Sequence, residues 1–149
     1  YDPYGPIFVG LSNNPLFAKQ MLDAVMQCAV AGQGPFLIKE HPMYPFSVKT
    51  TKGILLTNKH FTAHLGISCL IYCTGTIGLE GILNGIPTLR FQPKGFVALD
   101  ILPKSLSAIN VTSLTLQKTL VTMPSPPTCD TSLFLTPTQK KIWDEILEI

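Results

Sequence analysis

The segment Ile67-Ser68-Cys69-Leu70-Ile71-Tyr72-Cys73-Thr74-Gly75-Thr76-Ile77-Gly78-Leu79-Glu80-Gly81 decides the fold. It begins with an apolar run over residues 67–72, which is typical of a central parallel strand covered on both faces. A tight turn over residues 74–78 then leads into a helix, which Gly85 and Pro87 end. A buried strand followed directly by a helix predicts one unit of a parallel α/β sheet.

Similar short apolar runs predict four further strands, over residues 7–11, 36–39, 53–57 and 88–91. Asn14 and Pro15 are typical of a helix start, and apolar residues at helical spacing follow them. A helical turn is expected over residues 60–66 and a helix over residues 113–121, whereas residues 96–102 fit an irregular strand or a loop. This alternation predicts an α/β fold with a Rossmann-like doubly wound parallel sheet and right-handed crossovers.

Composition divides the chain into three parts. Residues 1–123 form the Rossmann-like unit, residues 124–136 a proline-rich connector, and residues 137–149 a C-terminal amphipathic helix. The sequence starts at Tyr1 without a methionine and enters the first strand almost at once. We therefore expect it to be a piece of a longer protein.

Overall composition excludes several classes of protein. The 149 residues are 46% hydrophobic and 13% charged, about half of the usual charged share of roughly 25%, so a disordered chain is not expected. A net charge of +2 gives no electrostatic footprint for nucleic acid. No apolar run reaches the ~18 residues that a membrane-spanning helix needs.

Cysteine and histidine spacing argues against a metal centre. The four cysteines are Cys28, Cys69, Cys73 and Cys129. They contain no Cys-x-x-Cys pair and fit neither a disulfide framework nor a zinc site, so we interpret them as reduced thiols, which favours a cytoplasmic location. His60 and His64 lie four residues apart without a third ligand, and we interpret them as part of a solvated helix face.

In an open parallel sheet, ligands bind beyond the carboxyl ends of the strands. Three loops are predicted there: Ser12-Asn13-Asn14, Lys39-Glu40-His41-Pro42 and Thr74-Gly75-Thr76-Ile77-Gly78. The first and third loops open helices, whose N-terminal amides and dipoles together favour an anion. Gly75 and Gly78 would let the backbone come close to a phosphate. The sequence therefore predicts a phosphorylated ligand.

Four side chains near these loops are candidates for ligand binding, and three of them also have a structural interpretation. Glu80 is either a carboxylate favoured by the helix dipole or an acceptor for a ribose diol. His41 is either a structural residue or a phosphate contact that favours the charged imidazole. Lys39 belongs either to a solvated face or to the phosphate site. Arg90 ends the fifth predicted strand near the same crevice, and its guanidinium suits bidentate binding of phosphate or carboxylate.

Three motifs, in this order, resemble the donor-binding half of GT-B-fold glycosyltransferases. They are Lys39-Glu40-His41-Pro42, Cys73-Thr74-Gly75-Thr76-Ile77-Gly78-Leu79-Glu80-Gly81 and Asn84-Gly85-Ile86-Pro87, and the resemblance covers about residues 7–121. The His-Pro step with a Ser/Thr turn is similar to bacterial polysialyltransferases and capsular Kdo transferases, which use CMP-sugars. The Gly-Thr-x-x-Leu-Glu turn with Gly-x-Pro is also similar to lipid-A-disaccharide synthase and the lipid II GlcNAc transferase, which use UDP-sugars.

The resemblance implies one half of a GT-B fold, which takes a CMP- or UDP-sugar as donor substrate without a further cofactor or a metal. Glu80 would hold the ribose hydroxyls, the turn at residues 74–77 would give donors to phosphate, and His41 would meet the phosphate next to the leaving sugar as the catalytic group. The expected nucleotide-sugar-binding residues are Ser12, Asn13, Asn14, Lys39, His41, Pro42, Thr74, Gly75, Thr76, Ile77, Gly78, Glu80 and Arg90.

Further expectations follow from the same resemblance. The chain would serve surface polysaccharide biosynthesis in the cytoplasm, either free or peripheral to the inner membrane, and would not be active alone. Its partners would be the nucleotide-sugar, a separate N-terminal acceptor domain and a membrane-associated glycan or lipid-linked acceptor, but no nucleic acid.

Two alternatives stay open. A UDP-GlcNAc 2-epimerase-like enzyme shares the fold, the Gly-rich turn and the downstream Gly-x-Pro, although that family usually has paired glutamates where Glu80 stands alone. The other is a non-catalytic nucleotide-binding or assembly module related to a transferase domain.

Overall fold

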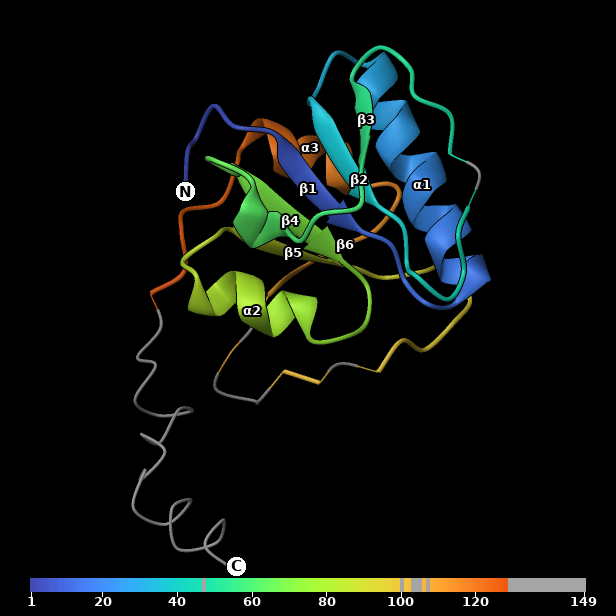
Figure 1. The fold of residues 1–149 in the computed structure, drawn as a ribbon. Coiled ribbons are helices and arrows are strands. Elements are labelled where there is room, and N and C mark those ends of the chain that lie inside the picture. The colour runs from blue at the N-terminus through green and yellow to red at the C-terminus, as the bar shows by residue number, and fades with distance from the viewer. Residues whose placement is uncertain (47, 100, 103–105, 107, 129–149) are drawn as a thin grey trace, which may run out of the picture.

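A computed structural model of the chain describes residues 1–46, 48–99, 101–102, 106 and 108–128 (Figure 1). The strands in this part are β1 (Ile7–Gly10), β2 (Phe36–Lys39), β3 (Ile54–Thr57), β4 (Cys69–Tyr72), β5 (Thr88–Phe91) and β6 (Ile109–Val111). They pair in parallel in one six-stranded sheet with the order β3-β2-β1-β4-β5-β6. This is the strand order of a Rossmann-like doubly wound sheet, so the predicted fold class is confirmed.

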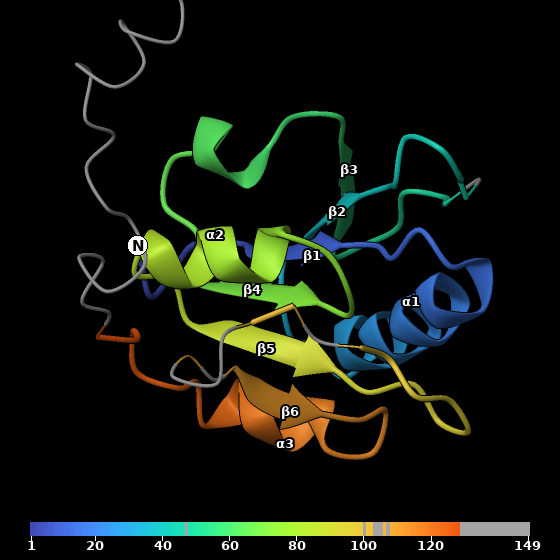
Figure 2. The same cartoon turned by 90° about the horizontal axis from the view of Figure 1, so that it is seen from below.

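Helices cover both faces of the sheet (Figure 2). They are α1 (Pro15–Val30), the short 3-10 helix η1 (Phe61–Ala63), α2 (Ile77–Leu83) and α3 (Leu116–Val121). Successive residues of a strand point to opposite faces, so Val9 and Ile71 pack in the cluster with α1 and α3, whereas Phe8 and Leu70 pack in the cluster with Phe61 of η1. Two buried layers result, as a doubly wound sheet requires.

Two glycines allow α2 to lie close to the sheet. A Cβ atom at Gly78 would lie 2.2 Å from Cζ of Tyr72, and one at Gly81 would lie 2.8 Å from Oγ1 of Thr88. Larger residues at these positions would push α2 away from β4 and β5. Gly78, which the sequence predicts to lie against a phosphate, thus has a packing role against Tyr72.

Most predicted elements agree with the structure. The predicted strands over residues 36–39 and 88–91 coincide with β2 and β5, and the others contain β1, β3 and β4. The expected turn over residues 60–66 contains η1, and α3 covers the second part of the helix expected over residues 113–121. The described residues of the 96–102 stretch contain neither helix nor strand, which agrees with a loop.

The sequence did not predict β6, and other expectations lie beyond the structure. Ile109 and Asn110 are exposed and only Val111 is buried, so this edge strand carries no apolar run. The expected helix over residues 137–149 and part of the connector over residues 124–136 lie outside the described residues. The division of the chain into three parts stays a prediction.

Buried thiols agree with the interpretation of reduced cysteines. Cys28, Cys69 and Cys73 are free and buried, whereas Cys129 lies outside the described residues. Burial raises the pKa of Cys69 to about 12, against a weaker opposing effect of the Leu70 backbone. These thiols are therefore neutral components of the core.

Candidate functional site

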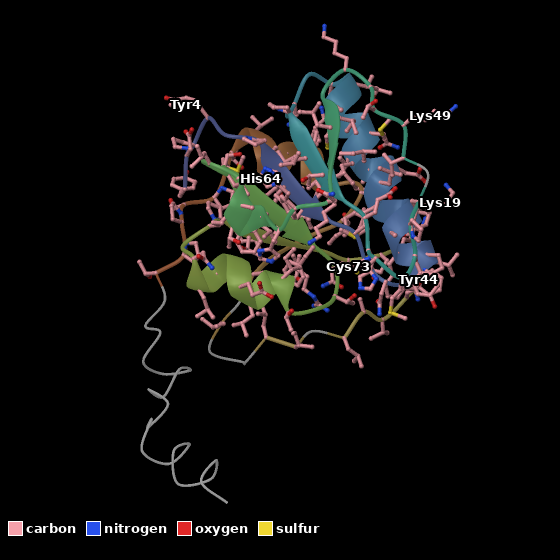
Figure 3. The ribbon with its side chains drawn as sticks, in the orientation of Figure 1. Tyr4, Lys19, Tyr44, Lys49, His64 and Cys73 are labelled. Carbon is pink, nitrogen blue, oxygen red and sulfur yellow. The ribbon has the colours of Figure 1, made fainter. Side chains whose placement is uncertain are left out.

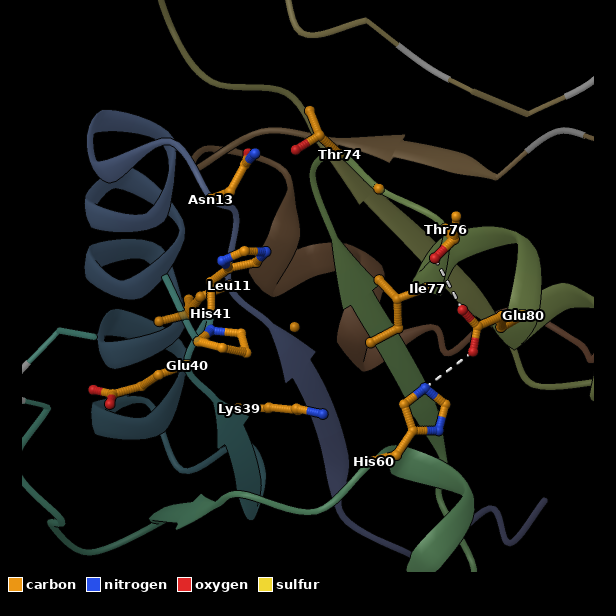
Figure 4. A pocket seen from close by; sticks show the side chains of 13 residues that line it. Leu11, Asn13, Lys39, Glu40, His41, His60, Thr74, Thr76, Ile77 and Glu80 are labelled. Atoms are coloured by element: carbon orange, nitrogen blue, oxygen red, sulfur yellow. Dashed lines mark hydrogen bonds and ion pairs between the residues drawn. The ribbon is translucent and has the colours of Figure 1, made fainter. Parts of the chain in front are cut away.

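A cleft of about 380 Å³ opens at the carboxyl edge of the sheet, where the strand order reverses between β1 and β4 (Figure 4). It lies between the β1–α1 connection, the end of β2 and the turn that joins β4 to α2. Its lining residues are Gly10, Leu11, Asn13, Lys39, Glu40, His41, Pro42, His60, Thr74, Gly75, Thr76, Ile77 and Glu80. A reversal of this kind is where doubly wound folds bind their ligands.

The turn between β4 and α2 leaves helix amides unpaired. Gly75 has a φ of 102°, which residues with a side chain rarely adopt, so the turn requires glycine. Thr76 does not cap α2, because its hydroxyl donates to Oε1 of Glu80 at 3.0 Å. Within the described part of the chain, the first three amides of α2 have no hydrogen-bond acceptor. These amides and the helix dipole favour negative charge at this end of the cleft.

The start of α1 lacks the free amides that the sequence predicts. Oδ1 of Asn14 accepts hydrogen bonds from the amides of Leu16 at 2.9 Å and Phe17 at 3.3 Å, and the first helical residue is a proline without an N–H. The amide of Asn14 itself donates to Oγ of Ser12 at 3.1 Å. The prediction of two helix starts with free amides is therefore wrong for α1, because the side-chain cap has already paired them.

Lys39 and His41 are the basic side chains at the end of β2. Figure 4 shows the Lys39 ammonium extending into the cleft toward His60, and Lys39 forms no ion pair with any described residue. Nδ1 of His41 accepts a hydrogen bond from the Met43 amide at 3.3 Å. Because Nδ1 accepts, the hydrogen of a neutral His41 imidazole lies on Nε2, which is then available to donate to a ligand.

Glu40, the acidic residue between them, turns away from the cleft centre (Figure 4). Its Oε1 accepts a hydrogen bond from the Val48 amide at 3.3 Å, on the loop that follows β2. The Glu40 charge is therefore directed to that loop and away from the turn before α2.

His60 is a cleft residue that the sequence pattern did not reveal. Its Nε2 lies 3.0 Å from Oε2 of Glu80, and the two side chains join η1 to α2 across one wall of the cleft (Figure 4). His64 instead lies with Nε2 3.1 Å from Oγ1 of Thr57. The expected shared solvated face is therefore wrong: His60 precedes η1 as its N-cap, and the two imidazoles contact different elements.

Four of the predicted binding residues do not line the cleft: Ser12, Asn14, Gly78 and Arg90. Ser12 is buried behind it, with Oγ 3.0 Å from Oγ1 of Thr74, and supports that turn. Asn14 caps α1 and Gly78 packs against Tyr72. Arg90 is buried and donates to the Ala98 carbonyl. A position at the carboxyl edge therefore does not by itself place a residue in the lining of the cleft.

Neither a cluster of metal ligands nor an ionised thiol is found among the described residues. The described residues contain no group of three or more His, Cys, Asp or Glu side chains placed to hold a metal ion. Cys73 immediately precedes the cleft turn, but burial raises its pKa to about 11 against the opposing charge of Arg90, so it is a neutral thiol.

Comparison with known proteins gives one distant structural similarity. No family model matches the chain, and no curated protein matches it. Among solved structures, the chain is similar to KpsC of Thermosulfurimonas dismutans, a beta Kdo 2,4 transferase, with 14% sequence identity and a TM-score of 0.42. The match covers 78% of this chain and 44% of that one, so the chain spans less than half of the length of KpsC.

In the described residues, we find no helix with the length and apolar character needed to cross a bilayer.

Proposed function

We propose that this chain is the donor-binding domain of a nucleotide-sugar-dependent glycosyltransferase of surface polysaccharide biosynthesis, with a CMP- or UDP-sugar as the donor. The observation that carries the proposal is the distribution of charge in one cleft. Lys39, His41 and the unpaired amides of α2 suit a phosphate, and the Glu80 carboxylate in the same cleft suits hydroxyl groups. A ribonucleotide presents both kinds of group on one molecule.

The donor phosphate would lie between the end of β2 and the turn before α2. The Lys39 ammonium attracts it, Nε2 of His41 donates to it, and the first amides of α2 add further donors. Hydrogen bonds to a charged group contribute about 1.5–3 kcal/mol each, so a few converging donors support binding.

Glycosyl transfer breaks the bond between the anomeric carbon and the phosphate oxygen, and negative charge grows on the departing phosphate. Lys39 and His41 would stabilise that charge, which is electrostatic catalysis by preorganised groups. We assign no general base to the described residues. The base and the binding site for the acceptor would come from another domain. The acceptor would be a membrane-associated glycan or lipid-linked sugar at the cytoplasmic side of the inner membrane.

Nucleotide titration of the isotopically labelled chain, followed by NMR, tests the proposal. We expect CMP, UMP or UDP and the corresponding sugar nucleotides to shift the amide signals of Thr76 and Glu80. The nucleotide with the largest effect should be the one that the donor sugar carries. Inorganic phosphate and free cytidine serve as matched controls for the two ends of the cleft. Unchanged Thr76 and Glu80 signals with every nucleotide would contradict the proposal.

A further inference from the structure

The Glu80 carboxylate is held from both sides before any ligand binds. Its Oε1 accepts a hydrogen bond from the Thr76 hydroxyl at 3.0 Å, and its Oε2 lies 3.0 Å from Nε2 of His60 (Figure 4). Thr76 belongs to the turn before α2, whereas His60 comes from the connection between β3 and β4. Two segments of the chain therefore fix one carboxylate.

The hydrogen bonds of His60 define which of its ring nitrogens donates. Nδ1 of His60 lies 3.0 Å from Oγ1 of Thr62 and 3.5 Å from the Thr62 amide, which can only donate. Nδ1 is therefore an acceptor, and the hydrogen of a neutral imidazole lies on Nε2, facing Glu80. His60 thus directs an N–H at Glu80.

The position of His60 is itself fixed by packing. Its ring lies against the ring of Phe61, with centroids 4.3 Å apart, and Phe61 is buried with its ring against Phe8 of β1 at 6.0 Å. The side chain is therefore anchored to the centre of the sheet through its neighbour. An imidazole held in this way loses little conformational freedom when Glu80 binds a ligand.

An ionised carboxylate has about four acceptor positions on its two oxygens. Thr76 and His60 each take one, on different oxygens, so each oxygen keeps acceptor capacity for a ligand. Two acceptors on one rigid carboxylate match the two O–H groups of a vicinal cis-diol, because each oxygen accepts one hydroxyl.

We propose that His60 is a positioning residue, which holds Glu80 in the orientation that receives the two ribose hydroxyls and so makes the cleft selective for ribonucleotides. The inference rests on the proposed function, since it concerns the sugar end of the nucleotide in the same cleft. His60 acts through Glu80 alone, because both of its ring nitrogens are already engaged.

Binding of CMP and of 2′,3′-dideoxy-CMP to the full 149-residue chain tests this role, with UMP and its dideoxy analogue as a second pair. We expect wild-type protein to bind CMP about tenfold more tightly than the dideoxy analogue. His60→Ala should remove most of this preference by weakening CMP binding five- to tenfold, and should change the affinity for the dideoxy analogue less than twofold. His60→Gln, whose amide nitrogen can replace Nε2 as a donor, should restore at least half of the preference.

His64→Ala is the matched control, since it removes an imidazole from the same connection at a position outside the cleft lining. It should leave the CMP preference unchanged. Equal weakening of both ligands by His60→Ala, or no weakening in a variant that melts like the wild type, would overturn the inference while the proposed function stands. Wild-type protein that binds neither ligand would overturn the proposed function and this inference with it.

Discussion

Among single residues, Lys39 is the side chain on which the proposed phosphate contact depends most. Its ammonium enters the cleft without an acidic partner among the described residues, and it ends a strand whose other residues are buried. A charge in this position contributes to binding only when the ligand carries phosphate, because a nucleoside offers it no opposite charge.

We predict that Lys39→Met weakens binding of CMP and UMP about tenfold and leaves binding of cytidine and uridine unchanged. The reason is the loss of one charge-assisted contact, for which a tenfold change corresponds to about 1.4 kcal/mol. Titration of each variant with nucleotide and nucleoside measures it. Lys49→Met is the control, because Lys49 is exposed and lies away from the cleft (Figure 3). A similar loss with both variants would contradict the prediction.

Residue types at the ends of strands predicted much of the cleft, but not which side chains enter it. The cleft is lined by Asn13, Lys39, His41 and Thr76 because parallel strands all end at one edge of the sheet. His60 was missed because its place depends on the path of a connection, and no periodicity describes that path. Arg90 was wrongly predicted to line the cleft for a related reason. Its position on the strand was predicted correctly, but its side chain is buried and does not point into the cleft.

At the scale of elements, the contact between α2 and β4 sets the height of the helix above the sheet. Gly78 faces the Tyr72 ring so closely that a methyl group would need the ring or the helix to move, because its Cβ would lie 2.2–2.6 Å from three ring atoms. Glu80 and the turn before α2 belong to the same helix start, so a shift of α2 would also displace the cleft wall.

We predict that Gly78→Ala lowers the free energy of unfolding by about 2 kcal/mol, because overpacking outweighs the better helix propensity of alanine. Urea unfolding followed by circular dichroism measures this change. The control is the same substitution in a Tyr72→Leu background, in which the ring is removed. There, Gly78→Ala should lower the free energy of unfolding by at least 1 kcal/mol less, which is roughly the coupling expected between contacting residues. Equal effects in both backgrounds would contradict the packing explanation.

Short elements show where sequence patterns stop being informative. The buried strands β1, β2 and β4 were predictable because nearly all of their residues are covered and apolar, and β5 because Leu89 and Phe91 alternate with its two polar residues. β6 has three residues with one buried, and it lies at the sheet edge, where polar and apolar side chains are equally tolerated. Its pairing with β5 depends on the rest of the sheet being in place.

For the whole molecule, the buried thiols couple stability to alkaline pH. The pKa of Cys69 is raised to about 12 and that of Cys73 to about 11, from an ordinary value of 9.0. Below pH 9 both thiols are neutral in the folded and unfolded chain, so they give no pH dependence. Above pH 9 the unfolded chain loses these protons while the folded chain keeps them, so stability falls as pH rises.

We predict that the two thiols together lower the free energy of unfolding by about 2–3 kcal/mol between pH 8 and pH 10, at about 1.4 kcal/mol per pH unit for each group. The measurement is urea unfolding across this range in the presence of a reductant. In a Cys69→Ala, Cys73→Ala variant, the free energy of unfolding should decline less than in the wild type, by this same amount. Lysine and tyrosine titration affects both proteins alike. Parallel curves for the two proteins would contradict the prediction.

The placement of β1 in the middle of the sheet affects how the nascent chain folds during synthesis. Ile7 is paired with Phe36 on one side and with Cys69 on the other, and every strand pair among the described residues is parallel, so no pair of these strands can form as a local hairpin. During synthesis, the central strand emerges long before its second partner exists. The edge of β1 that pairs with β4 then stays unpaired until β4 has been translated, and this interval is when chaperones have the most to protect.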